Sequence, residues 1–92
     1  MSLPSLRKQI DRLDLRLLRL LNRRAALALR VGRLKHRQGL AVFDGRREQA
    51  VLRQVDRANH GPLARGSVER VFREILRQSR QLERSGKKRV GD

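Results

Sequence analysis

The chain has 92 residues, no cysteine and a formal net charge of +15 at pH 7. This length predicts one domain with a small core, and the lack of cysteine excludes disulfide bonds and thiolate metal sites. The N-terminus lacks the apolar run of a signal peptide, and no apolar run could span a membrane, so we expect a soluble, cytoplasmic protein.

The first predicted helix begins near Pro4–Ser5 and ends at about Gln38. Proline suits the first turn of a helix, and Gly39 suits the left-handed residue that ends one. Along this helix apolar residues recur at alternating steps of three and four, a coiled-coil spacing. They form a seam of Leu3, Leu6, Ile10, Leu13, Leu17, Leu20, Leu27, Val31 and Leu34, with Arg24 occupying one seam position.

The length of this helix predicts a second copy of the chain. It is roughly 50 Å long, whereas a compact domain of this size has a radius of gyration of about 13 Å. Two short helices from the same chain cannot cover such a rod. We therefore expect a homodimer with the long helices packed together.

Two shorter helices are predicted to follow. Asp44 is a favourable N-cap residue for a helix that runs to about Asn59, and a third helix begins within Leu63–Ser67. No segment shows sustained strand alternation, so the sequence predicts an all-α fold of three helices. The helical domain is expected to span residues 1–84, and residues 85–92 to form a disordered basic tail. The stripes expected in the core are Val51, Val55 and Ala58, then Val68, Phe72, Ile75 and Leu82.

Each predicted helix also carries ionisable or polar side chains on its apolar face. Burying a lone charge costs several kcal/mol, so such groups must be paired, coordinated or served by a ligand. These residues are Arg24 and Lys35 in the first helix, Asp44, Arg47 and Glu48 in the second, and Ser79 and Glu83 in the third.

A structural explanation for these charges is a salt-bridge network in which Arg24 pairs with Glu48, and Asp44 with Arg47. A polar seam residue can also fix the register of a coiled coil.

A ligand site is the other explanation. Small residues (Ala25, Ala28 and Gly32) lie beside Arg24 and lead toward Lys35, and they permit either close helix packing or space for a ligand. Cations beside a cleft favour a small carboxylate anion, because arginine forms bidentate pairs with carboxylates.

Four segments together resemble the all-helical chorismate mutases: LRKQIDRLDLRLLRLLNRR (6–24), RVGRLK (30–35), VFDGRRE (42–48) and ILRQSRQLE (75–83). The resemblance covers about residues 5–84. It implies an intertwined dimer of three-helix chains, which agrees with the dimer inferred from helix length. It also implies conversion of chorismate to prephenate in aromatic amino-acid biosynthesis, without a cofactor or a covalent intermediate.

The resemblance implies catalytic roles on the first helix. Arg24 would hold one substrate carboxylate, and Arg7 would reach into the partner's site to hold the other. Lys35 would donate to the breaking ether oxygen and to a carboxylate. Catalysis would come from holding the substrate in its reactive shape and from electrostatic stabilisation.

The resemblance assigns ring recognition to the other two helices. Asp44, through its backbone, and Glu48 would recognise the ring hydroxyl. Arg47 would support Glu48 and the charge of the site, and Ser79 would bind the ring-side carboxylate.

Position 83 departs from one family pattern, in which glutamine donates a second hydrogen bond to the ether oxygen. Glu83 can donate only when it is protonated, because a carboxylate accepts hydrogen bonds only. We therefore expect activity to fall as pH rises.

Other functions stay open at the level of sequence. The charge of +15 suits a nucleic-acid-binding helical dimer, but Phe43 and Phe72 are the only aromatic residues for base stacking and the arginines are scattered, so we expect no nucleic-acid or membrane partner. A helical adaptor dimer, an isochorismate–pyruvate lyase and a mutase for an amino-substituted chorismate are further alternatives. His36 and His60 are expected on the surface, too few to hold a metal.

Overall fold

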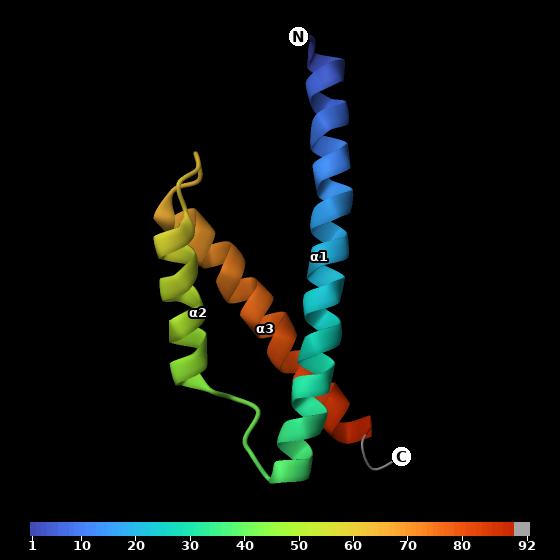
Figure 1. Ribbon diagram of the computed structural model, residues 1–92, viewed down its shortest axis with the longest axis vertical. Helices are drawn as coiled ribbons and strands as arrows, with labels where there is room; N and C mark the ends of the chain where they lie inside the picture. The colour runs from blue at the N-terminus through green and yellow to red at the C-terminus, as the bar shows by residue number, and fades with distance from the viewer. Residues whose placement is uncertain (90–92) are drawn as a thin grey trace.

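The computed structural model describes the backbone of residues 1–89 and the side chains of residues 1–85. It consists of three helices, α1 (Leu3–Gln38), α2 (Gly45–Ala58) and α3 (Arg65–Arg89), and residues 1–89 contain no strand (Figure 1). The predicted all-α fold with a long first helix is confirmed. No helix within this described part is long and apolar enough to cross a membrane.

Local capping sets both ends of α1. The Ser2 hydroxyl accepts a hydrogen bond from the Ser5 backbone N–H at 3.2 Å, which satisfies one free donor of the first turn. At the other end Gly39 adopts a left-handed φ of 69°, and the Leu40 N–H donates to the Lys35 carbonyl at 2.8 Å. The predicted glycine stop is therefore confirmed, because only glycine adopts this conformation without steric cost.

Asp44 caps α2 as predicted. Its Oδ1 accepts a hydrogen bond from the Arg47 backbone N–H at 3.0 Å. After α2 ends, the Asn59 side chain organises the connection to α3 by bonding to the Leu63 carbonyl and the Gly61 N–H.

The end of α3 differs from the prediction. The helix continues to Arg89 instead of ending near residue 84, so the expected disordered tail at 85–92 begins inside a helix. Lysine and arginine are good helix formers, which suits this continuation of the helix. Positions 90–92 lie outside the described residues.

The third helix, α3, is the central element of the packing. It contacts both α1 and α2, and it runs diagonally from the end of α2 to cross the C-terminal half of α1 (Figure 1). The small core lies between α2 and α3, where Val51, Leu52 and Leu76 are buried and Phe72 packs against them. The chain is elongated, with extents of 54 × 28 × 15 Å.

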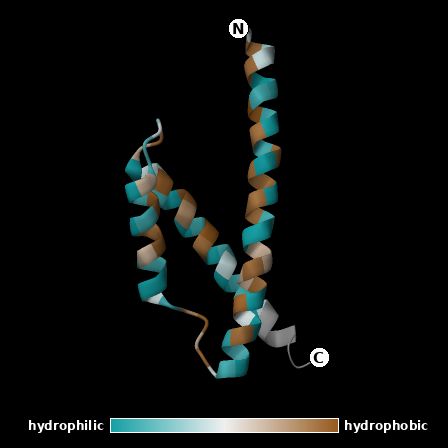
Figure 2. Cartoon of the chain, viewed as in Figure 1, coloured by the Kyte–Doolittle hydropathy of each residue, from teal (hydrophilic) through white to brown (hydrophobic). Residues whose placement is uncertain are grey.

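The N-terminal half of α1 extends beyond the other two helices (Figure 1). Every residue from 1 to 20 is exposed in the single chain, and apolar and polar residues alternate along this helix (Figure 2). The exposed apolar seam includes Leu3, Leu6, Ile10, Leu13, Leu17 and Leu20, each 40–59% exposed.

A different face of α1 packs against α3. Ala28 and Gly32 are buried there. A Cβ atom built on Gly32 would lie 2.3 Å from the Glu83 carbonyl oxygen and 2.6 Å from the Glu83 Cα. The two helix backbones therefore touch at this crossing, and only a residue without a side chain fits.

We predict that Gly32→Ala destabilises the protein, by about 1–3 kcal/mol, because the added methyl group forces α3 away from α1. Gly66→Ala is the matched control, since a Cβ there would meet only the flexible end of the Arg70 side chain at 3.4 Å. Helix propensity alone would make both substitutions stabilising by about 1 kcal/mol. Thermal or urea unfolding followed by circular dichroism measures the difference, and equal stabilisation of both variants would contradict the close crossing.

Candidate functional site

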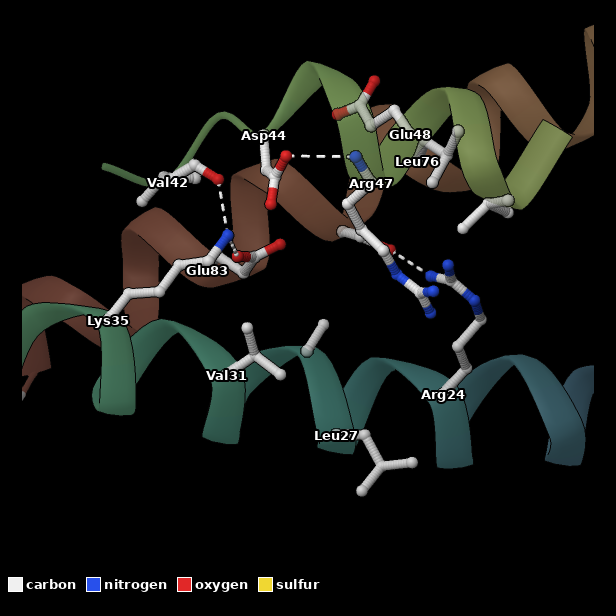
Figure 3. Close-up of a pocket in the computed structure, with 13 residues that line it drawn as sticks. Arg24, Leu27, Val31, Lys35, Val42, Asp44, Arg47, Glu48, Leu76 and Glu83 are labelled. Atoms are coloured by element: carbon white, nitrogen blue, oxygen red, sulfur yellow. Dashed lines mark hydrogen bonds and ion pairs between the residues drawn. The ribbon is translucent and has the colours of Figure 1, made fainter. Parts of the chain in front are cut away.

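A cavity of about 420 Å³ lies between α1, α3 and the first turns of α2 (Figure 3). This volume is within the usual range of small-molecule sites. Seven of the eight polar residues singled out from the sequence line it, and Arg7 is the exception. The seven are Arg24, Lys35, Asp44, Arg47, Glu48, Ser79 and Glu83.

Arg24 enters the cavity from α1 and is anchored by α3. Its Nη1 donates a hydrogen bond to the Ser79 hydroxyl, which in turn donates to the Ile75 carbonyl at 2.9 Å. Ser79 is buried, at 9% exposure, so this contact fixes the position of the guanidinium. The predicted proximity of Arg24 and Ser79 to the same ligand site is consistent with this geometry.

The Arg47 guanidinium reaches toward the same part of the cavity from α2 (Figure 3). Neither Arg24 nor Arg47 forms a salt bridge within residues 1–85. Two guanidinium groups directed at one region, without carboxylate partners, favour an anion between them.

Lys35 lies at the other end of the cavity, where α1 crosses α3. Its Nζ contacts the Glu83 Oε1 at 2.6 Å and donates to the Val42 carbonyl at 2.6 Å. The Lys35 and Glu83 side chains are 18% and 12% exposed, so this is a largely buried ion pair. Both residues line the cavity.

The ring-recognition residues on α2 are arranged differently from the prediction. Glu48 is held by Arg80 of α3, whose Nη1 lies 2.6 Å from Oε1 and 2.5 Å from Oε2. The support expected from Arg47 thus comes from another arginine. The Asp44 side chain accepts a hydrogen bond from the Arg47 backbone N–H and so caps the helix. The predicted salt bridges of Arg24 with Glu48 and of Asp44 with Arg47 are therefore wrong, because Glu48 pairs with Arg80 instead.

Arg80 is the residue that the sequence reasoning missed. A signal for it existed, because Leu76, Arg80 and Glu83 follow steps of four and three and therefore share one face of α3. Arg80 is half-buried and stands behind Glu48, outside the cavity lining.

Arg7 does not belong to the cavity of its own chain. It is exposed on the free half of α1, and 17 residues separate it from Arg24. At 1.5 Å per residue this is about 25 Å along the helix axis, too far for one side chain to reach.

Outside the cavity, Arg65 pairs with Asp56 and Glu69, and Arg77 pairs with Glu74. The adjacent Arg77 guanidinium, together with the Gln78 amide, lowers the pKa of Glu74 to about 2. Within the described residues there is no group of three or more His, Asp or Glu side chains arranged to hold a metal ion.

Fold and cavity together define a class of protein: a three-helix chain with a cavity lined by charged side chains, in which two guanidinium groups have no carboxylate partner among the described residues. The sequence profile of the chorismate mutase type II family matches residues 6–84. The chain therefore belongs to the chorismate mutase type II family.

Individual relatives agree with this assignment. The chain is 45% identical over 78 residues to a bifunctional chorismate mutase/prephenate dehydratase of Neisseria gonorrhoeae, covering 85% of this chain and 21% of that protein. A bifunctional chorismate mutase/prephenate dehydratase of Aquifex aeolicus is 36% identical over 86 residues, covering 89% of this chain and 24% of that protein. The chain thus spans only about a fifth to a quarter of the length of these relatives.

A solved structure matches at nearly full length. Chorismate mutase (form II) of Thermus thermophilus superposes with a TM-score of 0.86 at 36% identity, covering 88% of this chain and 92% of that chain. The three-helix arrangement is therefore shared along most of both chains.

Proposed function

We propose that this chain is a chorismate mutase that rearranges chorismate to prephenate, a step of aromatic amino-acid biosynthesis. The observation that carries the proposal is the cation-lined cavity of about 420 Å³, found in a chain that matches a solved chorismate mutase over most of its length. The cytoplasmic location expected from the sequence stays a prediction.

The chemistry fits the residues of the cavity. In this pericyclic rearrangement an ether C–O bond breaks while a C–C bond forms within one molecule, so no nucleophile is required. The protein must hold the flexible substrate in its reactive shape and stabilise negative charge on the ether oxygen. Arg24 would bind a substrate carboxylate, and Lys35 would donate to the ether oxygen and to a carboxylate.

The other residues would orient the ring. Glu48 would accept a hydrogen bond from the ring hydroxyl, and Asp44 would contribute through its backbone, because its side chain already caps α2. Arg47, free of a salt bridge among the described residues, would add positive charge. Ser79 would act at the ring-side carboxylate.

A homodimer with shared active sites is part of the proposal. The apolar seam on the N-terminal half of α1 is exposed in the single chain, and burial of such a surface favours association. Arg7 lies on the same free half and cannot reach its own cavity. A second copy along α1 would cover the seam and bring Arg7 into the partner's cavity.

Arg24→Ala should lower kcat/KM for chorismate by about 10²–10³-fold, the usual cost of removing one preorganised electrostatic group. Arg23→Ala, at the exposed neighbouring position, should leave it nearly unchanged. The assay follows the loss of chorismate absorbance and identifies the product. Release of pyruvate would indicate a lyase, and a lack of turnover with salt-steep binding of duplex DNA would favour the nucleic-acid alternative.

Shared sites predict complementation between two inactive variants. When Arg7→Ala and Arg24→Ala chains are mixed, unfolded and refolded together, half of the dimers are mixed and each carries one intact site. About a quarter of wild-type activity should return. No recovery, although the mixed dimers form, would mean that Arg7 does not act in the partner's site.

Glu83 would contribute a hydrogen bond to the ether oxygen, which a carboxyl group can donate only when it carries a proton. The Glu83→Gln variant, whose amide can always donate, should retain kcat/KM, whereas Glu83→Ala should lower it. An equal loss in both variants would remove the role of Glu83 as a donor.

A further inference from the structure

Arg80 joins three parts of the cavity wall without lining the cavity itself. Its Nη1 lies 2.5–2.6 Å from both carboxylate oxygens of Glu48. Its guanidinium carbon also lies 5.8 Å from the centre of the Phe43 ring, within cation–π range. One side chain of α3 therefore contacts both the first turn of α2 and the exposed Phe43 of the α1–α2 connection.

The contact with Phe43 lies close in sequence to the end of the cavity that holds Lys35. Phe43 stands between Val42, whose carbonyl accepts from Lys35, and Asp44, which caps α2. The Arg80–Phe43 contact therefore lies next to the carbonyl that accepts from Lys35.

The charges of the cavity show why Glu48 needs a cation of its own. Three cations line it (Arg24, Lys35 and Arg47), and three carboxylates line it (Asp44, Glu48 and Glu83), so the lining is formally neutral. Glu48 therefore offsets one of the cations that would attract a dianionic ligand. Arg80 adds the fourth cation from outside the lining and makes the net charge positive.

We propose that Arg80 is a positioning residue for substrate binding, an inference that rests on the proposed mutase function. It holds the Glu48 carboxylate in the orientation that receives the ring hydroxyl, and it cancels the negative charge that Glu48 would otherwise present to the substrate carboxylates. The Glu48–Arg80 pair is only 20–25% exposed, so bulk water screens its charges weakly.

This role predicts a specific kinetic signature. Arg80→Met leaves Glu48 as an unneutralised carboxylate beside a dianion, so KM should rise about tenfold, while kcat should change less than about threefold. Arg80→Lys retains the charge and should restore most of the affinity.

A double-mutant cycle with Glu48→Gln separates this role from a structural one. In the Glu48→Gln background, Arg80→Met should change KM by less than about twofold. Arg77→Met is the matched control: Arg77 is one turn away on α3 and pairs with Glu74 on its own helix, so its loss should leave KM unchanged. Circular dichroism melting checks that each variant is folded, and Arg80→Gln replaces Arg80→Met in the cycle if the latter does not fold.

If the wild type turns over chorismate, two results would overturn the inference about Arg80 and leave the proposed function intact. One is an unchanged KM in the Arg80 variant. The other is an equal KM increase with and without Glu48, or with Arg77→Met, which would indicate a structural or general charge effect. A wild type that does not turn over chorismate would instead overturn the proposed function, and this inference with it.

Discussion

The cavity depends on the backbone contact between α1 and α3 at Gly32 and Glu83, where a side chain on residue 32 would collide with the Glu83 carbonyl. Because the helices meet this closely, Lys35, one turn further along α1, reaches the Glu83 carboxylate. Away from the crossing, Arg24 spans the gap to Ser79 on α3. The crossing thus brings the two helices together at Lys35 and leaves room for a ligand between Lys35 and Arg24.

The charges of the site are costly for a chain with so small a core. Val51, Leu52 and Leu76 are the main buried apolar cluster, and a partly buried ion pair adds little net stability because desolvation offsets its attraction. The presence of such pairs in the cavity is better explained by ligand binding. The proposed dicarboxylate substrate would neutralise the two guanidinium groups that have no carboxylate partner among the described residues.

Those features that depend on neighbouring residues could be predicted from the sequence. The Asp44 cap and the Gly39 stop are local hydrogen-bonding and φ requirements, and helical periodicity placed seven polar residues on faces that do line one cavity. Periodicity was less accurate within the core. In α2 the buried partner of Val51 is Leu52, whereas Ala58, the last residue of α2, is exposed.

The sequence by itself therefore determined the helices, their polar faces and the family resemblance, since these follow from spacing along one chain. Only the tertiary structure decided the partners. Glu48 pairs with Arg80, 32 positions away, and not with Arg24 or Arg47, because the crossing of α3 brings that guanidinium behind α2. Spacing shows which face a side chain occupies, but the angle and depth of helix packing determine which opposite charge it meets.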